Sequence, residues 1–157
     1  MKKTLFIILI VLGLIQFIRP TLNVSTVVSS NDINRRYPVP DSVLKLLKRS
    51  CYDCHSNNTV YPWYDRVQPV AWWLQYHVNH GKRGLNFSEF LTYTPKRKVH
   101  KLQSISDLIK SDDMPLSSYL WIHTYAKLND GDKSLITHWA DSLREVIAPD
   151  TLAQAGK

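Results

Sequence analysis

Cysteine and glycine are both scarce in this sequence of 157 residues, which has two cysteines and five glycines. Both cysteines lie well inside the chain, at positions 51 and 54, so a lipid anchor on an N-terminal cysteine is excluded. No internal repeat is found, and the alternating pattern of β-strands is weak. With 44% apolar and 11% aromatic residues, the chain can nevertheless form one folded core.

The sequence also lacks a large net charge when the basic residues near its start are not counted. The formal net charge is +7, but it falls to +4 without Lys2, Lys3 and Arg19, which flank a terminal apolar segment. A small excess of this kind is no argument for binding a polyanion. We therefore expect no nucleic-acid partner.

The first twenty residues differ from the rest of the chain. Two lysines precede an almost wholly apolar run from Leu5 to Ile18, and Arg19 and Pro20 follow it. This pattern is typical of a cleaved signal peptide or a short uncleaved signal-anchor, and the lack of small residues at a cleavage site favours the anchor. We predict a single N-terminal transmembrane helix in a bacterial inner membrane, with the remaining chain in the periplasm because the basic end stays in the cytoplasm.

Helical periodicity dominates the remaining chain and predicts an all-α fold with long loops. We expect a membrane segment 1–20, a tether 21–37, one domain 38–148 and a flexible tail 149–157. The segments expected to be helical are 41–51, 69–81, 87–93, 95–110 and 130–147. Asp41, Thr94 and Asn129-Asp130 are the expected N-terminal caps of the first, fourth and last segments. Gly81 should end the second segment, and Pro149 should end the last. In the second segment Val70, Trp73, Leu74 and His77 share one face.

The strongest signal is Cys51-Tyr52-Asp53-Cys54-His55. Two cysteines three positions apart at a helix end can form thioethers with the two vinyl groups of one porphyrin, and the next histidine then lies beneath the iron. C-x-x-C-H is the attachment signature of c-type haem, and attachment occurs outside the cytoplasm, where the predicted anchor places this domain. We therefore expect one covalent haem c, held by Cys51, Cys54 and His55.

Other interpretations of the same residues fit less well. A zinc site needs two more ligands, and the pair His77 and His80 lies too far along the chain for the usual spacing. A thioredoxin-like pair needs its first cysteine at a helix N-terminus, whereas Cys51 follows a helix. A disulfide between Cys51 and Cys54 remains possible but leaves His55 unexplained.

A second axial ligand is expected to be Met114, the only methionine besides the initiator. Electron-transfer cytochromes commonly use methionine, which raises the reduction potential. Met114 follows two aspartates and precedes a proline, where an apolar side chain is exposed unless something draws it inward. The rival ligands are the histidines at positions 77, 80, 100 and 123.

The surroundings of the iron can be sketched further. The other ring nitrogen of His55 should donate to a backbone carbonyl, which we expect near Pro62 or Pro69. Trp63, Trp72 and Trp73 are candidates for the haem walls, although each could equally be ordinary core.

Four strings together resemble the bacterial haem-binding domain family of small monohaem relatives of cytochrome c. They are Cys-Tyr-Asp-Cys-His-Ser at 51–56, Tyr-Pro-Trp-Tyr at 61–64, Leu-Asn-Phe-Ser-Glu-Phe at 85–90 and Met-Pro-Leu-Ser-Ser-Tyr at 114–119. The resemblance covers roughly residues 38–145. It implies a cytochrome c-like helical domain with one covalent haem, His55 on one face and Met114 on the other.

We expect from this a membrane-anchored carrier of single electrons that serves a redox partner protein or a respiratory complex. Because both axial positions would be filled, we expect no catalytic residues and no enzyme activity. The alternatives are a haem peroxidase or gas sensor with an open or displaceable distal ligand, and a structural haem-bearing subunit.

Overall fold

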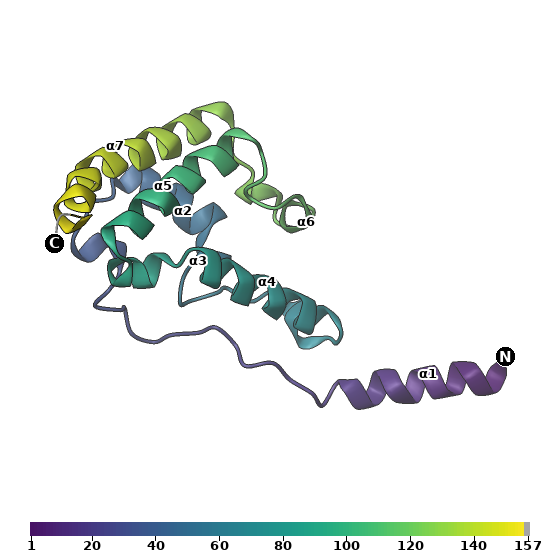
Figure 1. Ribbon diagram of the computed structural model, residues 1–157. Helices are drawn as coiled ribbons and strands as arrows, with labels where there is room; N and C mark the ends of the chain where they lie inside the picture. The colour runs from purple at the N-terminus through teal and green to yellow at the C-terminus, as the bar shows by residue number, and fades with distance from the viewer. Residues whose placement is uncertain (156–157) are drawn as a thin grey trace.

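The computed structural model describes residues 1–155, and all the regular elements in this range are helices (Figure 1). The α-helices are α1 (Lys2–Ile15), α2 (Asp41–Ser50), α3 (Tyr52–His55), α4 (Val70–Gly84), α5 (Pro95–Lys110), α6 (Ser117–Leu120) and α7 (Asp130–Ala155). The 3-10 helices are η1 (Ile33–Arg35), η2 (Trp63–Arg66), η3 (Phe87–Thr92) and η4 (Thr124–Ala126). The prediction of an all-α chain is confirmed.

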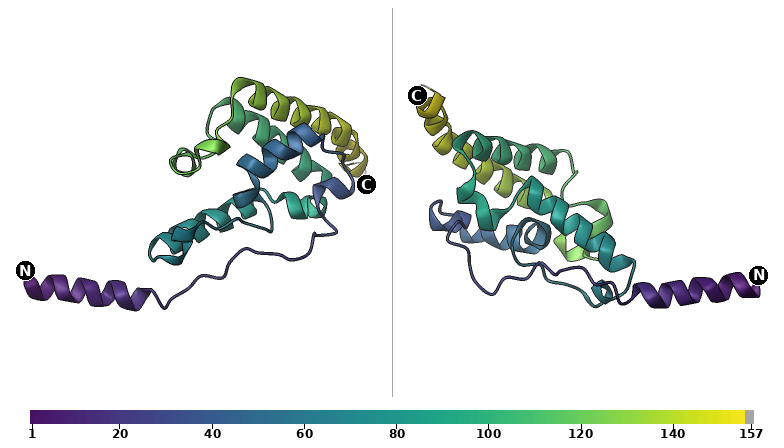
Figure 2. Two further views of the ribbon diagram at one scale, coloured as in Figure 1. Left: turned by 180° about the vertical axis from the view of Figure 1, so that it is seen from behind. Right: turned by 60° about the horizontal axis from the view of Figure 1, so that its bottom comes forward.

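The core forms where α5 and α7 lie side by side in antiparallel directions, with α2 packed against α7 (Figures 1 and 2). Each helix contributes apolar residues at helical spacing, so a continuous apolar stripe on each can be buried. The buried residues are Val43, Leu46 and Leu47 on α2, Leu102, Ile105 and Ile109 on α5, and Ile136, Trp139, Ala140, Leu143 and Ile147 on α7.

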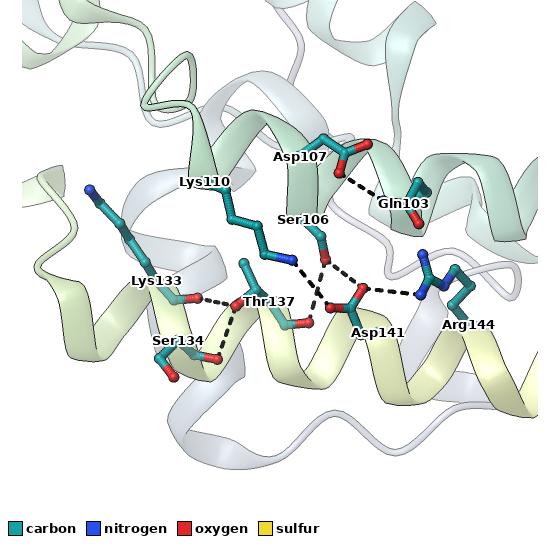
Figure 3. Close-up of polar contacts among 9 residues, drawn as sticks. All are labelled: Gln103, Ser106, Asp107, Lys110, Lys133, Ser134, Thr137, Asp141 and Arg144. Carbon is teal, nitrogen blue, oxygen red and sulfur yellow. Dashed lines mark hydrogen bonds and ion pairs between the residues drawn. The ribbon is translucent and has the colours of Figure 1, made fainter.

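A polar contact crosses the same interface (Figure 3). The Ser106 side chain is fully buried, and its hydroxyl donates to Asp141 Oδ1 at 2.9 Å. Lys110 and Arg144 lie 3.5 and 3.7 Å from the same carboxylate. Burial of this serine is tolerated because its hydroxyl has a partner.

Two of the three predicted caps are present. The Thr94 side chain accepts from Arg97 N at 3.4 Å, and Asn129 Oδ1 accepts from Asp132 N at 2.8 Å. The third prediction is wrong, because Pro40 is the N-cap of α2 and Asp41 is its first residue, with no side-chain cap. The Asp41 carboxylate still stabilises the helix, because its negative charge lies near the positive N-terminal end of the helix dipole.

Helix α4 departs from its prediction at its end and in its buried face. It continues past Gly81 to Gly84, and its buried residues are Ala71, Gln75 and Val78. The predicted face, which carries Val70 and Trp73, borders a cavity instead of the core. An apolar stripe in a sequence predicts that one face of a helix is covered, but it does not identify the neighbour that covers this face.

Helix α7 continues through Pro149, where we predicted its end, to Ala155. A proline removes one backbone donor from the helix but does not by itself stop it when the preceding turns are packed. The flexibility predicted for the tail stays a prediction, and its last two residues lie outside the described range.

At the other end, α1 extends away from the domain (Figures 1 and 2). It has 14 residues, none of them buried. Within residues 1–155 no helix is both long and apolar enough to cross a bilayer, so the predicted transmembrane helix is not supported. A span usually takes about 20 residues.

The segment that we expected to be a tether is bound to the domain, first by hydrogen bonds of Asn23 with Ser56 and Thr59 and then by apolar burial in its second half. Ile33 is fully buried and Tyr37 nearly so, and both belong to the core cluster. Leu91 N donates to Asn31 O at 3.0 Å, which ties the segment to η3. These residues are part of the folded domain because their apolar side chains are covered by it.

Candidate functional site

The cysteines and the histidine of the motif lie on one tight turn, α3, at the end of α2. Cys51 N donates to Leu47 O at 2.8 Å, so the turn continues directly from α2, and His55 N donates to Cys51 O at 3.0 Å. The Tyr52 ring stacks on Phe87 at 5.3 Å and packs against the core. Packing of Tyr52 and Cys51 against the core therefore fixes the turn.

Helix α4 packs closely on α3 at Gly81. A Cβ atom at this position would lie 2.7 Å from Cys54 O and 3.0 Å from Cys54 Cβ. Only a residue without a side chain lets the two backbones approach this far. Gly81 thus has a packing role in place of the helix-ending role that we predicted.

His55 is held in one orientation by the backbone. Its Nδ1 lies 3.0 Å from Leu85 O. A carbonyl oxygen can only accept, so Nδ1 carries the hydrogen and Nε2 has the free lone pair that a metal needs. Burial lowers the pKa of His55 and favours this neutral form. The prediction of a backbone partner is confirmed, but its place near Pro62 or Pro69 is wrong.

The loop that presents Leu85 O is itself fixed to the residues after His55. Asn86 Nδ2 donates to Asn57 Oδ1 at 2.8 Å, and Asn57 Nδ2 donates to Glu89 Oε1 at 2.7 Å. Asn57 N also donates to Ser88 Oγ at 3.1 Å. This network holds the Leu85 carbonyl next to the His55 ring. It could not be predicted from the sequence, because its partners are about thirty positions apart.

Two adjoining cavities, of about 320 and 280 Å³, open beside α3. Both are lined by Ser50, Cys51, His55, His80, Gly81, Met114 and Pro115. The further walls of the larger one are mainly apolar and include Leu47, Leu85, Phe87, Ile105, Leu108, Ile109 and Leu128. An imidazole with a free lone pair, two neighbouring thiols and apolar walls fit a haem.

Met114 reaches these cavities from the loop after α5. Asp113 N and Met114 N both donate to Leu108 O, at 3.0 and 3.1 Å, and Asp112 has a φ of 62°. A residue with this left-handed backbone conformation commonly ends a helix, and aspartate adopts the conformation more readily than most residues with a side chain. The turn places Met114 in the lining together with His55, although the aspartates beside it are exposed.

The four histidines that compete with Met114 as ligands lie at different places relative to the two cavities. His80 lines both cavities, His100 lines the larger and His77 the smaller. His123 lies outside both and stacks on Tyr119 at 4.1 Å. Position therefore leaves His80 as the main competitor of Met114, and the choice of ligand stays a prediction.

The thiols do not resemble a redox pair or a zinc site. Burial raises the pKa of Cys51 to about 12 and that of Cys54 to about 11, whereas thiol–disulfide enzymes lower the pKa of the attacking cysteine. Both cysteines are free thiols. Within residues 1–155, no cluster of three or more His, Cys, Asp or Glu could hold a metal ion.

The tryptophans do not form the predicted walls. Trp63 and Trp73 line a separate cavity and are 80% and 49% exposed. Trp72 Nε1 donates to Ile18 O at 3.0 Å. Leucine, isoleucine and phenylalanine from α2, α5 and η3 take the place that we had assigned to these aromatic residues, because those elements face α3.

A further residue of the site, Tyr119, was not predicted. Its hydroxyl donates to Asp53 Oδ2 at 2.7 Å and so links α6 to the motif. Asp53 Oδ1 accepts from Val60 N at 3.1 Å. The aspartate inside the motif therefore joins α6 to the loop that follows α3.

Comparison with known proteins agrees with this geometry. No curated protein and no solved structure was found to match the chain. A family model described as "Haem-binding domain" matches residues 10–142, which include α3, α4, α5 and Met114. The resemblance noted in the sequence is thereby confirmed, and the chain belongs to the haem-binding domain family.

Proposed function

We propose that the protein is a monohaem c-type cytochrome that carries single electrons. Cys51 and Cys54 would hold the porphyrin by thioethers, and His55 and Met114 would bind the iron from opposite sides. The observation that carries this proposal is the hydrogen bond from His55 Nδ1 to Leu85 O, which leaves Nε2 free as a ligand beside the two thiols.

The surrounding residues support a carrier of electrons over a catalyst. When bound, a haem supplies an iron that accepts and releases one electron. The apolar side chains of Leu47, Phe87 and Ile109 exclude water from the larger cavity, and a dry site with a methionine ligand raises the reduction potential. With Met114 bound to the iron as well as His55, no coordination position would be left for a substrate.

We also propose that the N-terminal segment associates with a bacterial inner membrane and that the domain lies in the periplasm. Support comes from α1, a helix with no buried residue that begins with Lys2 and Lys3 and is otherwise largely apolar. So large an exposed apolar surface requires an apolar environment. Anchoring of this kind would keep the domain near a redox partner protein or a respiratory complex.

The ligand assignment is tested by comparing Met114→Ala with His80→Ala in haem-loaded protein. We expect the near-infrared sulfur-to-iron band of the oxidised wild type to disappear in Met114→Ala and to persist in His80→Ala. Only Met114→Ala should bind carbon monoxide rapidly when reduced, and its potential should fall.

The opposite pattern, with an altered spectrum in His80→Ala alone, would contradict the assignment of Met114. Rapid carbon monoxide binding by the reduced wild type would contradict the carrier function and favour a gas sensor or peroxidase.

A further inference from the structure

A third cavity, of about 360 Å³, lies next to the haem cavities between α4, η2 and the α6–η4 segment. We propose that it binds a lipid-soluble hydroquinone. The proposal deepens the electron-carrier function by naming the chemical class of a partner, and its meaning for electron transfer rests on that function.

The walls suit a flat apolar ring. They are formed mainly by apolar and aromatic side chains, among them Trp63, Tyr64, Val70, Trp73, Leu74 and Ile122. Three of these, Trp63, Trp73 and Ile122, are 49% to 80% exposed. Aromatic side chains favour stacked and edge-on contacts with other rings, so a ring in the cavity would cover surface that is otherwise in contact with water.

One polar side chain of the lining, His77, offers a hydrogen-bond acceptor. His77 Nδ1 lies 2.8 Å from Trp73 O, and a carbonyl only accepts, so His77 has its hydrogen on Nδ1 and a free lone pair on Nε2. His123 Nδ1 likewise lies 3.1 Å from Tyr119 O, but its Nε2 already has the Tyr64 hydroxyl as a partner at 3.4 Å. The Tyr119 hydroxyl is already committed to Asp53. His77 Nε2 therefore suits a ligand that donates a hydrogen bond, as the hydroxyls of a hydroquinone do and the carbonyls of a quinone do not.

The cavity adjoins the haem site through shared residues. Asp53, Cys54, His77, Leu116 and Tyr119 line both this cavity and the smaller haem cavity. Cys54 is one of the two predicted thioether residues. A ring bound here would therefore lie next to a residue that would hold the haem, as an electron donor must.

The apolar helix α1 joins the domain at the same place. Ile18 O accepts from Gln68 Nε2 and from Trp72 Nε1, each at 3.0 Å, and Gln68 N donates to Gln16 Oε1 at 2.9 Å. These contacts fix the end of the apolar segment to the start of α4, which forms one wall of the cavity. A ligand dissolved in lipid would thus arrive next to its site.

The proposal is tested by calorimetric titration of tetramethylhydroquinone into the full-length, haem-loaded protein in detergent. The protein is kept reduced under anaerobic conditions so that no electron is transferred. We expect saturable binding, at least about fivefold weaker in His77→Phe and for the dimethyl ether of the same hydroquinone, which has no hydroxyl donors. Ile122→Trp should also weaken binding by filling the cavity, whereas His138→Phe, an exposed change on α7, should not.

Absence of saturable binding to the wild type would overturn the proposal. So would equal affinity for the hydroquinone and its dimethyl ether, or binding that Ile122→Trp leaves unchanged. Ile122→Trp keeps the test decisive if His77→Phe alters the haem spectrum. Because binding is measured without electron transfer, its failure is distinct from a failure of the carrier function, which the Met114→Ala spectra reveal.

Discussion

At Gly81, the lack of a side chain decides how closely α4 approaches the haem-binding turn. The backbone carbonyl and the Cβ atom of Cys54 lie where a side chain would begin. Neither can move without shifting α3, because the turn is anchored by the stacking of Tyr52 on Phe87. The spacing of the two helices, and with it the position of Cys54, therefore depends on one residue.

Gly81→Ala should accordingly destabilise the protein by about 1–3 kcal/mol, as overpacking does. Gly84→Ala is the matched control, because a Cβ at this position in the same helix meets no atom within 4 Å. We expect it to be neutral or slightly stabilising. Urea unfolding of both variants checks this, and equal stabilities would contradict the close-packing role of Gly81.

The hydrogen bond between Tyr119 and Asp53 should make stability depend on pH. Burial and the bond to the Asp53 carboxylate raise the pKa of Tyr119 above its usual range. The folded state thus holds the protonated phenol, and its contribution is present below the unfolded pKa of about 10 and lost as the pH rises further.

Tyr119→Phe should therefore cost about 1 kcal/mol at pH 8 and clearly less at pH 11. The exposed Tyr76 supplies the control, since Tyr76→Phe should have the same small effect at both values. Denaturant unfolding at the two pH values measures the difference. A cost of Tyr119→Phe that is independent of pH would show that the bond is not formed.

The residues of the motif could be predicted because they are neighbours in the chain, and a c-type attachment site is a local pattern. Met114 could be proposed because the sequence offers no other internal methionine. Leu85 and Tyr119 could not be predicted, since their contacts with His55 and Asp53 arise only when α4, η3 and α6 pack around α3.

At the scale of elements, the antiparallel pair α5 and α7 forms the support for the haem-binding face. Ser106 is the fully buried polar residue at their interface, and its hydroxyl donates to Asp141 (Figure 3). The Asp141 carboxylate also attracts Lys110 and Arg144. The network joins the two helices at one register.

Ser106→Ala should lower the free energy of unfolding by about 1 kcal/mol through loss of this hydrogen bond. Ser134→Ala, an exposed change on α7, should alter it by less than about 0.5 kcal/mol. Thermal or urea unfolding distinguishes them. Two variants of equal stability would mean that the buried contact does not contribute.

The elements that were predicted best are those with strong periodicity and recognisable caps. Thr94-Pro95 and Asn129 mark the starts of α5 and α7 correctly, because side-chain capping is a local effect. The buried face of α4 was mispredicted because its apolar stripe borders a cavity instead of the core. Which neighbour covers a face is decided by the whole fold.

At the scale of the whole molecule, the folded domain does not need α1 for its core. The core cluster begins at Ile33, and α1 contributes no buried residue. Residues 1–20 are hydrogen-bonded to the domain near their end, through Gln16, Ile18 and Arg19. Membrane association and folding should therefore be separable.

Replacing residues 1–20 with a cleavable signal sequence should leave the haem spectrum unchanged and abolish association with lipid vesicles. Flotation of the full-length and shortened proteins with phosphatidylethanolamine–phosphatidylglycerol vesicles measures this. If the shortened protein floats as well as the full-length one, the membrane-binding surface lies elsewhere on the domain.

The central claim is that one haem is bonded to Cys51 and Cys54, and intact-protein mass spectrometry under denaturing conditions tests it most directly. The protein is produced in bacteria that attach c-type haem, as wild type and with both cysteines replaced by serine. The wild type should carry the added mass of one haem, and the Cys51→Ser, Cys54→Ser variant should carry none. A wild type that loses its haem on denaturation, or a variant that retains it, would contradict the account.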